Sequence, residues 1–349
     1  MLKTPVYAAA SAGARLAASF IERRDPGPKD VLIDILYSGI CHSDIHQARD
    51  EWGGAVFPMV PGHEIIGRVK QVGKDVTKFK VGDAAAVGCF VDSCGVCGPC
   101  REDLENFCEK GVAYTYNSTE MDRKTPTYGG YSSQIVVREH YALKVPETLD
   151  MAGAAPLLCA GITTYSPLRQ FNCKKGDRVA VVGLGGLGHM AVKFAASMGA
   201  EVTVLSTSRS KEADAQRLGA RGFAVTKEAG AFTKLANQFD LIIDTVSAPH
   251  DYNQYLGTVR PHGTLVLVGV PPEPSPVSAF SLINGNKRLA GSNIGGIAET
   301  QEMLNYCAEH QIVSDVETIS IQQVNDAYER MVKNDVRYRF VIDTSTLKA

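Results

Sequence analysis

The residues with the clearest chemistry in this chain are four cysteines packed between positions 94 and 108, namely Cys94, Cys97, Cys100 and Cys108. Spacers of two residues allow successive thiolates to turn toward one ion, and the intervening glycines and proline permit the tight turns that such a loop needs. Zinc accepts four thiolates in a closed tetrahedral site without strain, although an iron cluster uses the same ligands. The segment therefore predicts a structural metal site and says nothing about catalysis.

A second group of metal-binding residue types comes from three other segments. Residues 41–46 read Cys-His-Ser-Asp-Ile-His, residues 61–64 read Pro-Gly-His-Glu, and Cys159 follows later. Each is ambiguous alone, because a buried cysteine is more often a core residue and a lone histidine is usually structural. Together, Cys41, His63 and Cys159 would give two thiolates and an imidazole with one open position, which is the arrangement of a catalytic zinc.

A glycine motif occupies residues 183–188, which read Gly-Leu-Gly-Gly-Leu-Gly after a strand-like run at 178–182. Such glycines permit a tight turn and let a pyrophosphate approach the N-terminus of the following helix. Glycine-assisted packing of a helix on a strand is the alternative explanation. The position between a strand and a helix favours a dinucleotide site.

The type of dinucleotide depends on the end of the next strand, where an NAD site usually places an acidic residue. Residues 205–211 read Leu-Ser-Thr-Ser-Arg-Ser-Lys and contain no carboxylate. Hydroxyls and two cations suit the 2′-phosphate of NADP(H), although a solvated basic turn would have the same composition. The residues concerned are Ser206, Thr207, Ser208, Arg209 and Lys211.

Length and composition set the class of protein. A chain of 349 residues exceeds the size of one hydrophobic core, and 44% apolar with 21% charged residues is typical of globular domains. The net charge of −2 offers no basic surface for nucleic acid or an anionic membrane. The apolar runs are too short to cross a bilayer, and the N-terminal segment is a poor signal peptide. Six of nine cysteines stand in metal-type settings, which favours a reducing cytoplasm.

Two patterns of secondary structure divide the chain. Up to about residue 150, strand-like runs at 31–36, 65–70 and 135–137 alternate with turns, which predicts a partly open β-barrel. From residue 177, strands alternate with helices, which predicts a doubly wound parallel sheet. The expected strands there are 178–182, 201–205, 239–244 and 264–268, and the expected helices are 188–198 and 210–218. A helix over 299–310 and a strand over 340–342 follow.

The Pro-Gly-His-Glu segment, the four-cysteine loop and the glycine motif together resemble the zinc-dependent medium-chain alcohol dehydrogenases. Within that family the chain is most similar to the cinnamyl-alcohol-dehydrogenase-like branch of NADP-dependent aldehyde reductases, over essentially its whole length. The resemblance implies an α/β protein with a GroES-like catalytic domain over residues 1–155, a Rossmann NADP-binding domain over 156–296, and a return to the catalytic domain over 297–349.

The resemblance also implies roles for single residues at the metal centres. Cys41, His63 and Cys159 would bind a catalytic zinc that Glu64 can approach, and Asp44 would orient the His63 ring. The four-cysteine loop would bind a structural zinc, which makes two zinc ions per subunit. Ser43 and His46 would relay a proton through the cofactor ribose to solvent. His42 stands where many relatives carry an arginine near the pyrophosphate, so that contact would be weaker or absent, with Arg339 as the candidate replacement. Apart from the resemblance, Gln47, Trp52, Cys89 and Phe90 lie near the metal ligands in the sequence and are candidates for the substrate cleft, although core packing explains Trp52 and Phe90 equally well.

The implied function is interconversion of primary alcohols with aromatic and medium-chain aliphatic aldehydes in a cytoplasmic homodimer. Zinc would polarise the aldehyde oxygen and NADPH would deliver a hydride. The cofactor residues expected are Gly183, Gly185, Gly186, Leu187, Gly188, Ser206, Thr207, Ser208, Arg209, Lys211 and Val268.

Two other functions compete with this interpretation. One is a zinc polyol or secondary-alcohol dehydrogenase on the same fold, and the other is a Cys₄ zinc or iron–sulfur protein without dehydrogenase activity. The second leaves residues 61–64 and the glycine motif unexplained.

Overall fold

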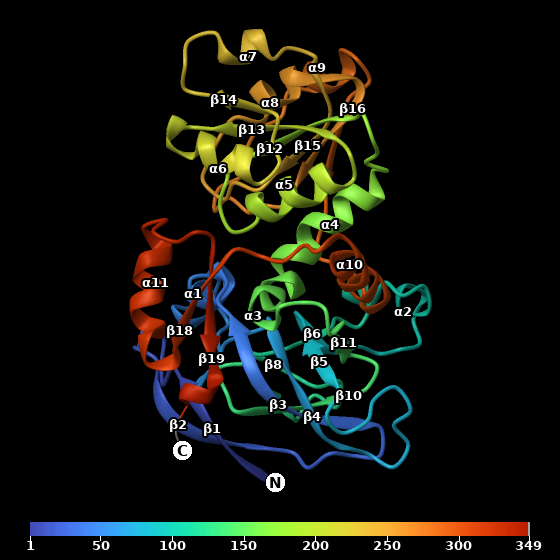
Figure 1. Cartoon of the computed structure of the whole chain (residues 1–349), viewed down its shortest axis with the longest axis vertical. Helices are drawn as coiled ribbons and strands as arrows, with labels where there is room; N and C mark the ends of the chain where they lie inside the picture. The colour runs from blue at the N-terminus through green and yellow to red at the C-terminus, as the bar shows by residue number, and fades with distance from the viewer. Residues whose placement is uncertain (348–349) are drawn as a thin grey trace. The chain divides into compact units, whose positions relative to one another are not determined.

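The structure is a computed structural model that describes residues 1–347 (Figure 1). The chain forms two compact units, one of residues 1–159 with the described residues from 295 onward, and one of residues 160–294. Within residues 1–347, no helix combines the length and the apolar character that a membrane span requires.

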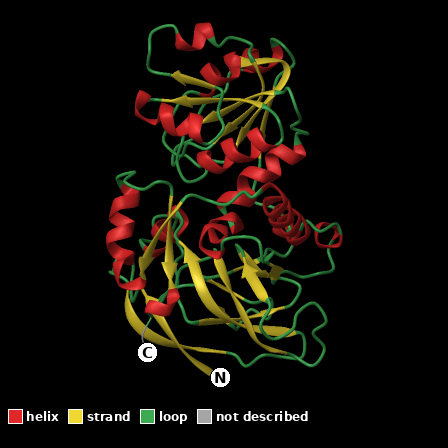
Figure 2. Cartoon of the chain, viewed as in Figure 1, coloured by secondary structure: helices red, strands yellow, loops and turns green. Residues whose placement is uncertain are grey.

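A seven-stranded sheet forms the body of the first unit (Figure 2). Its strands are β3 (Asp30–Gly39), β4 (Ile65–Val72), β5 (Ala84–Val87), β10 (Gln134–Arg138), β11 (Leu143–Lys144), β18 (Val316–Ser320) and β19 (Arg339–Asp343). They follow the order β11-β5-β4-β3-β19-β18, and β10 also pairs with β3. β18 and β19 run parallel, whereas the other pairs are antiparallel. β3 is buried or half-buried along its whole length, which explains its long apolar run.

Short hairpins and helices complete the first unit. The hairpins pair β1 (Leu2–Ala8) with β2 (Ala17–Arg23), β6 (Phe90–Asp92) with β7 (Ala113–Tyr114), and β8 (Ser118–Thr119) with β9 (Pro126–Thr127). The α-helices are α1 (His42–Ala48), α2 (Gly98–Arg101), α3 (Met151–Ala154), α10 (Ile297–His310) and α11 (Val324–Val332). The 3-10 turns are η1 (Glu105–Phe107), η2 (Ala155–Leu158), η4 (Ile321–Gln323) and η5 (Thr344–Thr346).

Helix α11 shows why this unit needs the C-terminal part of the chain. Its buried residues Val324, Ala327, Tyr328 and Met331 recur every three or four positions and therefore share one face. That face belongs to the same core cluster as Phe340 of β19 and residues of the N-terminal hairpin. Burial of this stripe holds the two ends of the chain in one unit.

The second unit contains a six-stranded sheet in which every pair is parallel. Its strands are β12 (Arg178–Val182), β13 (Glu201–Ser206), β14 (Gly222–Val225), β15 (Phe239–Asp244), β16 (Val259–Leu267) and β17 (Arg288–Gly291). The order β14-β13-β12-β15-β16-β17 is that of a dinucleotide-binding Rossmann sheet. The predicted doubly wound parallel sheet is confirmed.

The helices of the second unit are α4 (Ala160–Gln170), α5 (Gly188–Ser197), α6 (Glu212–Arg217), α7 (Ala231–Lys234), α8 (Tyr252–Thr258) and α9 (Ala279–Ile283), with one 3-10 turn, η3 (Arg209–Lys211). The predicted helix over 210–218 is therefore a 3-10 turn followed by a shorter α-helix. Ser208 caps this turn, because its side chain accepts a hydrogen bond from the Ser210 N–H.

Candidate metal centres and cofactor site

Three segments of the first unit bring metal-binding atoms together. Cys41 precedes α1, His63 and Glu64 precede β4, and Cys159 follows η2. One ligand atom from each of these four residues lies within 4.8 Å of all the others. The side chains proposed for the catalytic metal thus meet at one point, although 118 positions separate the two cysteines.

Pairing of β3 with β4 explains how two of these segments meet. Ser38 is the partner of Ile65, so the residues after β3 lie beside the residues before β4. The Gly39 N–H donates to the Glu64 carbonyl over 2.9 Å. A side chain at Gly39 would collide with the Glu64 carboxylate, which explains a glycine at this strand end.

The donor set fits a zinc ion. A tetrahedral site with Zn–S bonds of about 2.3 Å separates its sulfurs by about 3.8 Å, and the sulfurs of Cys41 and Cys159 lie 3.9 Å apart. Glu64 is fully buried and forms an ion pair with buried Arg339. Burial raises the pKa of Glu64 to about 7, against the opposing effect of Arg339. The structure places the Arg339 side chain against Glu64. A contact between Arg339 and the pyrophosphate of the cofactor stays a prediction.

Asp44 connects the segments that carry the metal-binding residues. Its carboxylate accepts hydrogen bonds from the Cys41 N–H at 2.9 Å and the Gly62 N–H at 3.1 Å, and from the Tyr131 hydroxyl at 3.2 Å. The His63 Nδ1 lies 3.3 Å from the same carboxylate. Burial lowers the pKa of His63, but the charges of Asp44 and Cys89 and the hydrogen bonds to Asp44 and Cys41 together outweigh this effect and hold that pKa well above its ordinary value. An Nδ1–H directed at Asp44 leaves the Nε2 lone pair for a metal.

The two residues predicted to relay a proton lie on α1. The Ser43 hydroxyl is half-buried, 3.7 Å from the Cys41 sulfur. His46 is partly exposed, hydrogen-bonds through Nδ1 to Glu51 and stacks on Trp52 with ring centroids 4.9 Å apart. Glu51 was not predicted from the sequence. A carboxylate on Nδ1 fixes the histidine tautomer and leaves Nε2 free to exchange a proton.

The residues predicted for the substrate cleft have different surroundings. Phe90 is buried edge-on against Tyr141, which is core packing. Gln47 accepts a hydrogen bond from Asn117 at 2.5 Å, and the Cys89 thiol donates to the Leu158 carbonyl at 3.5 Å. His42, expected near the pyrophosphate, is exposed.

Sequence reasoning missed the tyrosines around the cluster. The Tyr116 ring stacks on His63 with centroids 5.8 Å apart, and the Tyr328 hydroxyl donates to that of Tyr131 over 3.4 Å. All three rings are buried. They come from segments far from residues 41–64 in the chain, so no spacing could have indicated them.

The four cysteines of the loop also converge. One sulfur from each of Cys94, Cys97, Cys100 and Cys108 lies within 4.8 Å of the others, and those of Cys94 and Cys100 are 3.9 Å apart. Hydrogen bonds from the Val96 and Cys97 backbone lower the pKa of Cys94 to about 6, which favours the thiolate that binds metal. This geometry fits a closed tetrahedral zinc site.

The glycine motif lies between β12 and α5 in the second unit. Gly183 has a φ of +85°, and a side chain there would come within 2.8 Å of Val246. A side chain at Gly185 would meet no atom within 4 Å, so the backbone at this position is open to a ligand. The remaining residues of the motif are Gly186, Leu187 and Gly188, the last of which begins α5. The turn thus fits a pyrophosphate at the helix N-terminus.

The other predicted cofactor residues lie at or after the carboxyl ends of two parallel strands of the same sheet, β13 and β16. Ser206 ends β13, and Val268 follows β16, where its N–H donates to Asp244. Arg209 forms ion pairs with Glu212 at 3.0 Å and Glu228 at 2.6 Å. A 2′-phosphate would therefore compete with two carboxylates for this guanidinium. Thr207 and Ser208 are exposed, and Lys211 donates to the Leu184 carbonyl at 2.8 Å.

Comparison with known proteins agrees with this fold and these clusters. Residues 27–147 match the alcohol dehydrogenase GroES-like domain, and residues 186–309 match the zinc-binding dehydrogenase family. The chain is 56% identical over 345 residues to a probable formaldehyde dehydrogenase of Bacillus subtilis, covering 99% of each chain. It is 55% identical over 347 residues to an NADP-dependent alcohol dehydrogenase of Mycobacterium bovis, covering 99% of this chain and 100% of the other.

Solved structures give the same result. A cinnamyl alcohol dehydrogenase from Sorghum bicolor superposes with a TM-score of 0.96 at 45% identity, and one from Helicobacter pylori complexed with NADP(H) with a TM-score of 0.92 at 44% identity. Each comparison covers 99% of both chains. The chain belongs to the zinc-binding alcohol dehydrogenases and is an oxidoreductase with a GroES-like and a Rossmann-type domain, as the sequence predicted.

We predict two zinc ions per chain with separable roles. Cys100→Ser should lose the zinc of the loop and lower the unfolding midpoint, because that metal holds a lobe with little apolar core. Cys159→Ser should keep the fold and abolish turnover. Metal analysis and thermal unfolding test both variants, with Cys173→Ser as the control because Cys173 belongs to neither cluster. A folded, active wild type with a single zinc per chain would contradict this prediction.

Asp44→Asn should weaken metal binding at the buried cluster about 10- to 100-fold, because the His63 ring would lose the carboxylate that fixes it. Competition with a chelator measures this affinity. Asp50→Asn, on the half-buried turn after α1, serves as the matched control, because Asp50 is outside the metal cluster and asparagine keeps the oxygen that accepts from the Ala55 N–H. An unchanged zinc affinity in Asp44→Asn would show that the hydrogen bonds around Asp44 serve packing alone.

Proposed function

We propose that this protein interconverts primary alcohols and aldehydes with NADP(H), using a zinc ion held by Cys41, His63 and Cys159. The proposal rests on one observation, which is that two cysteine sulfurs and one imidazole meet in a buried cluster. The fourth residue of this cluster, Glu64, forms an ion pair with Arg339. A set of three protein ligands leaves a coordination position for substrate, as in catalytic rather than structural zinc sites. When bound there, zinc would polarise a carbonyl oxygen.

In our proposal, residues 1–155 and 297–349 form the catalytic domain and residues 156–296 the NADP-binding domain. Cys94, Cys97, Cys100 and Cys108 bind the second zinc of each subunit. We infer a cytoplasmic homodimer. All nine cysteines are free in the structure, which fits a reducing compartment, and the homodimer rests on the family resemblance.

Two residues of α1, Ser43 and His46, transfer the proton in this proposal. Reduction of an aldehyde requires a proton at the developing alcohol oxygen, and the Ser43 hydroxyl beside Cys41 supplies it. His46, partly exposed and held by Glu51, then returns a proton to Ser43 from water. Oxidation of an alcohol uses the same groups in the opposite order.

NADP(H) is the proposed cofactor because the end of β13 has hydroxyls and cations in place of an acidic residue. The similar proteins from Mycobacterium bovis and Helicobacter pylori are named as NADP-dependent or complexed with NADP(H). Ser206, Thr207, Ser208, Arg209 and Lys211 bind the 2′-phosphate in this proposal.

The proposed substrates are aromatic and medium-chain aliphatic aldehydes. Similarity to cinnamyl alcohol dehydrogenase structures supports an aromatic substrate. NADPH consumption with linear, branched and aromatic aldehydes tests this directly. Comparable activity with polyols or secondary alcohols would favour the alternative assignment, because a polyol site has to place hydrogen-bonding groups along the substrate.

Ser43→Ala should lower the turnover rate about 100-fold or more, because a positioned acid contributes that much to a proton-transfer step. Ser43→Thr keeps a hydroxyl and should retain most of the rate. His46→Gln should have a smaller effect, since water can reach this partly exposed side chain. Steady-state kinetics with zinc content verified measures all three. A wild-type rate in zinc-loaded Ser43→Ala would remove the relay from the mechanism.

The enzyme should prefer NADPH over NADH by about 100-fold or more in kcat/KM, because two or three charge-assisted hydrogen bonds to the 2′-phosphate give that discrimination. Arg209→Ala should raise the KM for NADPH about tenfold and leave the NADH constants unchanged. Thr207→Asp should narrow or invert the preference. Arg221→Ala is the matched control, since Arg221 pairs with Glu201 on the same sheet. Equal efficiency with both cofactors in the wild type would overturn the assignment.

A further inference from the structure

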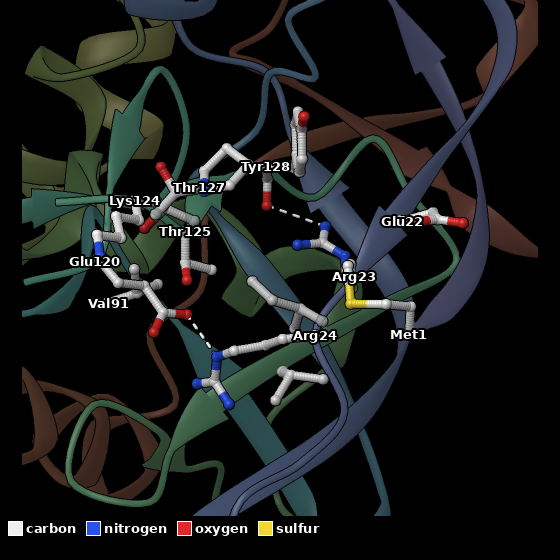
Figure 3. Close-up of a pocket in the computed structure, with 14 residues that line it drawn as sticks. Met1, Glu22, Arg23, Arg24, Val91, Glu120, Lys124, Thr125, Thr127 and Tyr128 are labelled. Carbon is white, nitrogen blue, oxygen red and sulfur yellow. Dashed lines mark hydrogen bonds and ion pairs between the residues drawn. The ribbon is translucent and has the colours of Figure 1, made fainter. Parts of the chain in front are cut away.

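A pocket of about 290 Å³ opens in the first unit, and none of its lining residues belongs to the metal clusters (Figure 3). It is lined by the end of β2, by the β8–β9 hairpin and its turn, and by residues of β6 and β10. The proposed reaction leaves this pocket without a role.

The most unusual residue in the pocket is Arg23, which is only 8% exposed. Its Nη2 donates to the carbonyls of Tyr128 at 2.9 Å and Gly129 at 3.0 Å, and to the Ser132 hydroxyl at 2.9 Å. All these partners are neutral, and among residues 1–347 no carboxylate forms an ion pair with Arg23. Burial lowers the pKa of Arg23 to about 9, which reflects the missing counter-ion. A buried cation is normally paired with an anion.

The adjacent Arg24 provides a comparison within the same pocket. Its guanidinium is half-buried and forms ion pairs with Asp30 and, at 2.7 Å, with Glu120. Figure 3 shows Arg24 directed at Glu120, whereas Arg23 is directed at Tyr128 and the Glu22 carboxylate points away from it. The fold therefore neutralises one arginine of the pair and leaves the charge of the other unmatched.

Other donors in the pocket also lack partners. The Nε of Arg23 and the hydroxyl of Thr127 are both buried and have no hydrogen-bond partner in the described part of the chain. Lys124, on the turn before β9, is exposed and makes no ion pair with any residue from 1 to 347. An unsatisfied buried polar group is unfavourable, so a ligand that accepts hydrogen bonds from the Arg23 Nε and the Thr127 hydroxyl would bind favourably.

The rest of the lining is apolar. Val91, Ile135 and Val136 are each less than 10% exposed and form a wall beside the charged groups. An inorganic anion would leave this wall without contacts, whereas a short hydrocarbon tail would cover it.

We propose that this pocket binds a small monocarboxylate with a short apolar tail. Its carboxylate is paired with Arg23 and Lys124 and accepts a hydrogen bond from Thr127, and its tail packs on Val91, Ile135 and Val136. Guanidinium and carboxylate groups match in geometry as well as in charge.

Calorimetric titration of the zinc-loaded protein, saturated with NADP⁺, with sodium butyrate at constant ionic strength tests this proposal. We expect a butyrate site that is abolished in Arg23→Gln and weakened about tenfold in Thr127→Val, the loss of one hydrogen bond to a charged group. Lys124→Gln should also weaken binding, and Lys74→Gln should not, because Lys74 is exposed and outside the pocket. Thr127→Val keeps the side-chain shape and removes a hydroxyl without a partner, so it should fold even where Arg23→Gln does not.

Three results would overturn the proposal. One is the absence of butyrate binding to the wild type, and another is butyrate binding that Thr127→Val and Lys124→Gln leave unchanged, which would place the ligand elsewhere, such as at the catalytic metal. The third is binding of chloride or phosphate as tight as that of butyrate, because the apolar wall would then contribute nothing.

Discussion

The buried carboxylate of Asp44 is the interaction on which the catalytic cluster depends. It has no access to solvent. It accepts hydrogen bonds from the backbone N–H of Cys41 before α1, from the backbone N–H of Gly62 before β4, and from the Tyr131 hydroxyl. A buried charge of this kind is stable only while every partner stays in place. The same contacts that satisfy Asp44 bring Cys41 beside His63 and set the orientation of the imidazole. The chemistry of this oxidoreductase thus rests on a residue that need not touch substrate.

The metal-binding residues could be predicted from the sequence because thiolates, imidazoles and their spacing are themselves the chemistry. The surroundings could not be predicted in the same way. Tyr116 and Tyr131 reach the cluster from other loops, and Glu51 meets His46 through a turn whose geometry no spacing specifies. Arg209 shows the same limit: its charge predicts a contact with the 2′-phosphate, which stays a prediction, but no spacing predicts its ion pair with Glu228. Residue type predicts what a group can do, and the fold determines what it meets.

The two units also differ in how far their strands and helices can be predicted from the sequence. Strands 178–182 and 239–244 were predicted with their observed bounds, because central strands of a parallel sheet are continuous apolar runs. β1, β2 and α11 were not predicted. The burial pattern of β2 leaves most of its residues exposed, and α11 is amphipathic with a polar outer face, so both are recognisable only through the core that they cover. The unmatched charge of Arg23 arises in this less regular part of the chain.

In the proposed reaction, the aldehyde reacts at the open metal site formed by Cys41, His63 and Cys159. Replacement of zinc by cobalt makes that site visible, because thiolate-to-cobalt absorption depends on the ligands of the ion. The most direct measurement is stopped-flow spectroscopy of the cobalt-substituted protein mixed with NADPH and an aromatic aldehyde. We predict a change in the cobalt spectrum that precedes or accompanies NADPH oxidation and that is absent in Cys159→Ser. NADPH oxidation at the normal rate with an unchanged cobalt spectrum would contradict it.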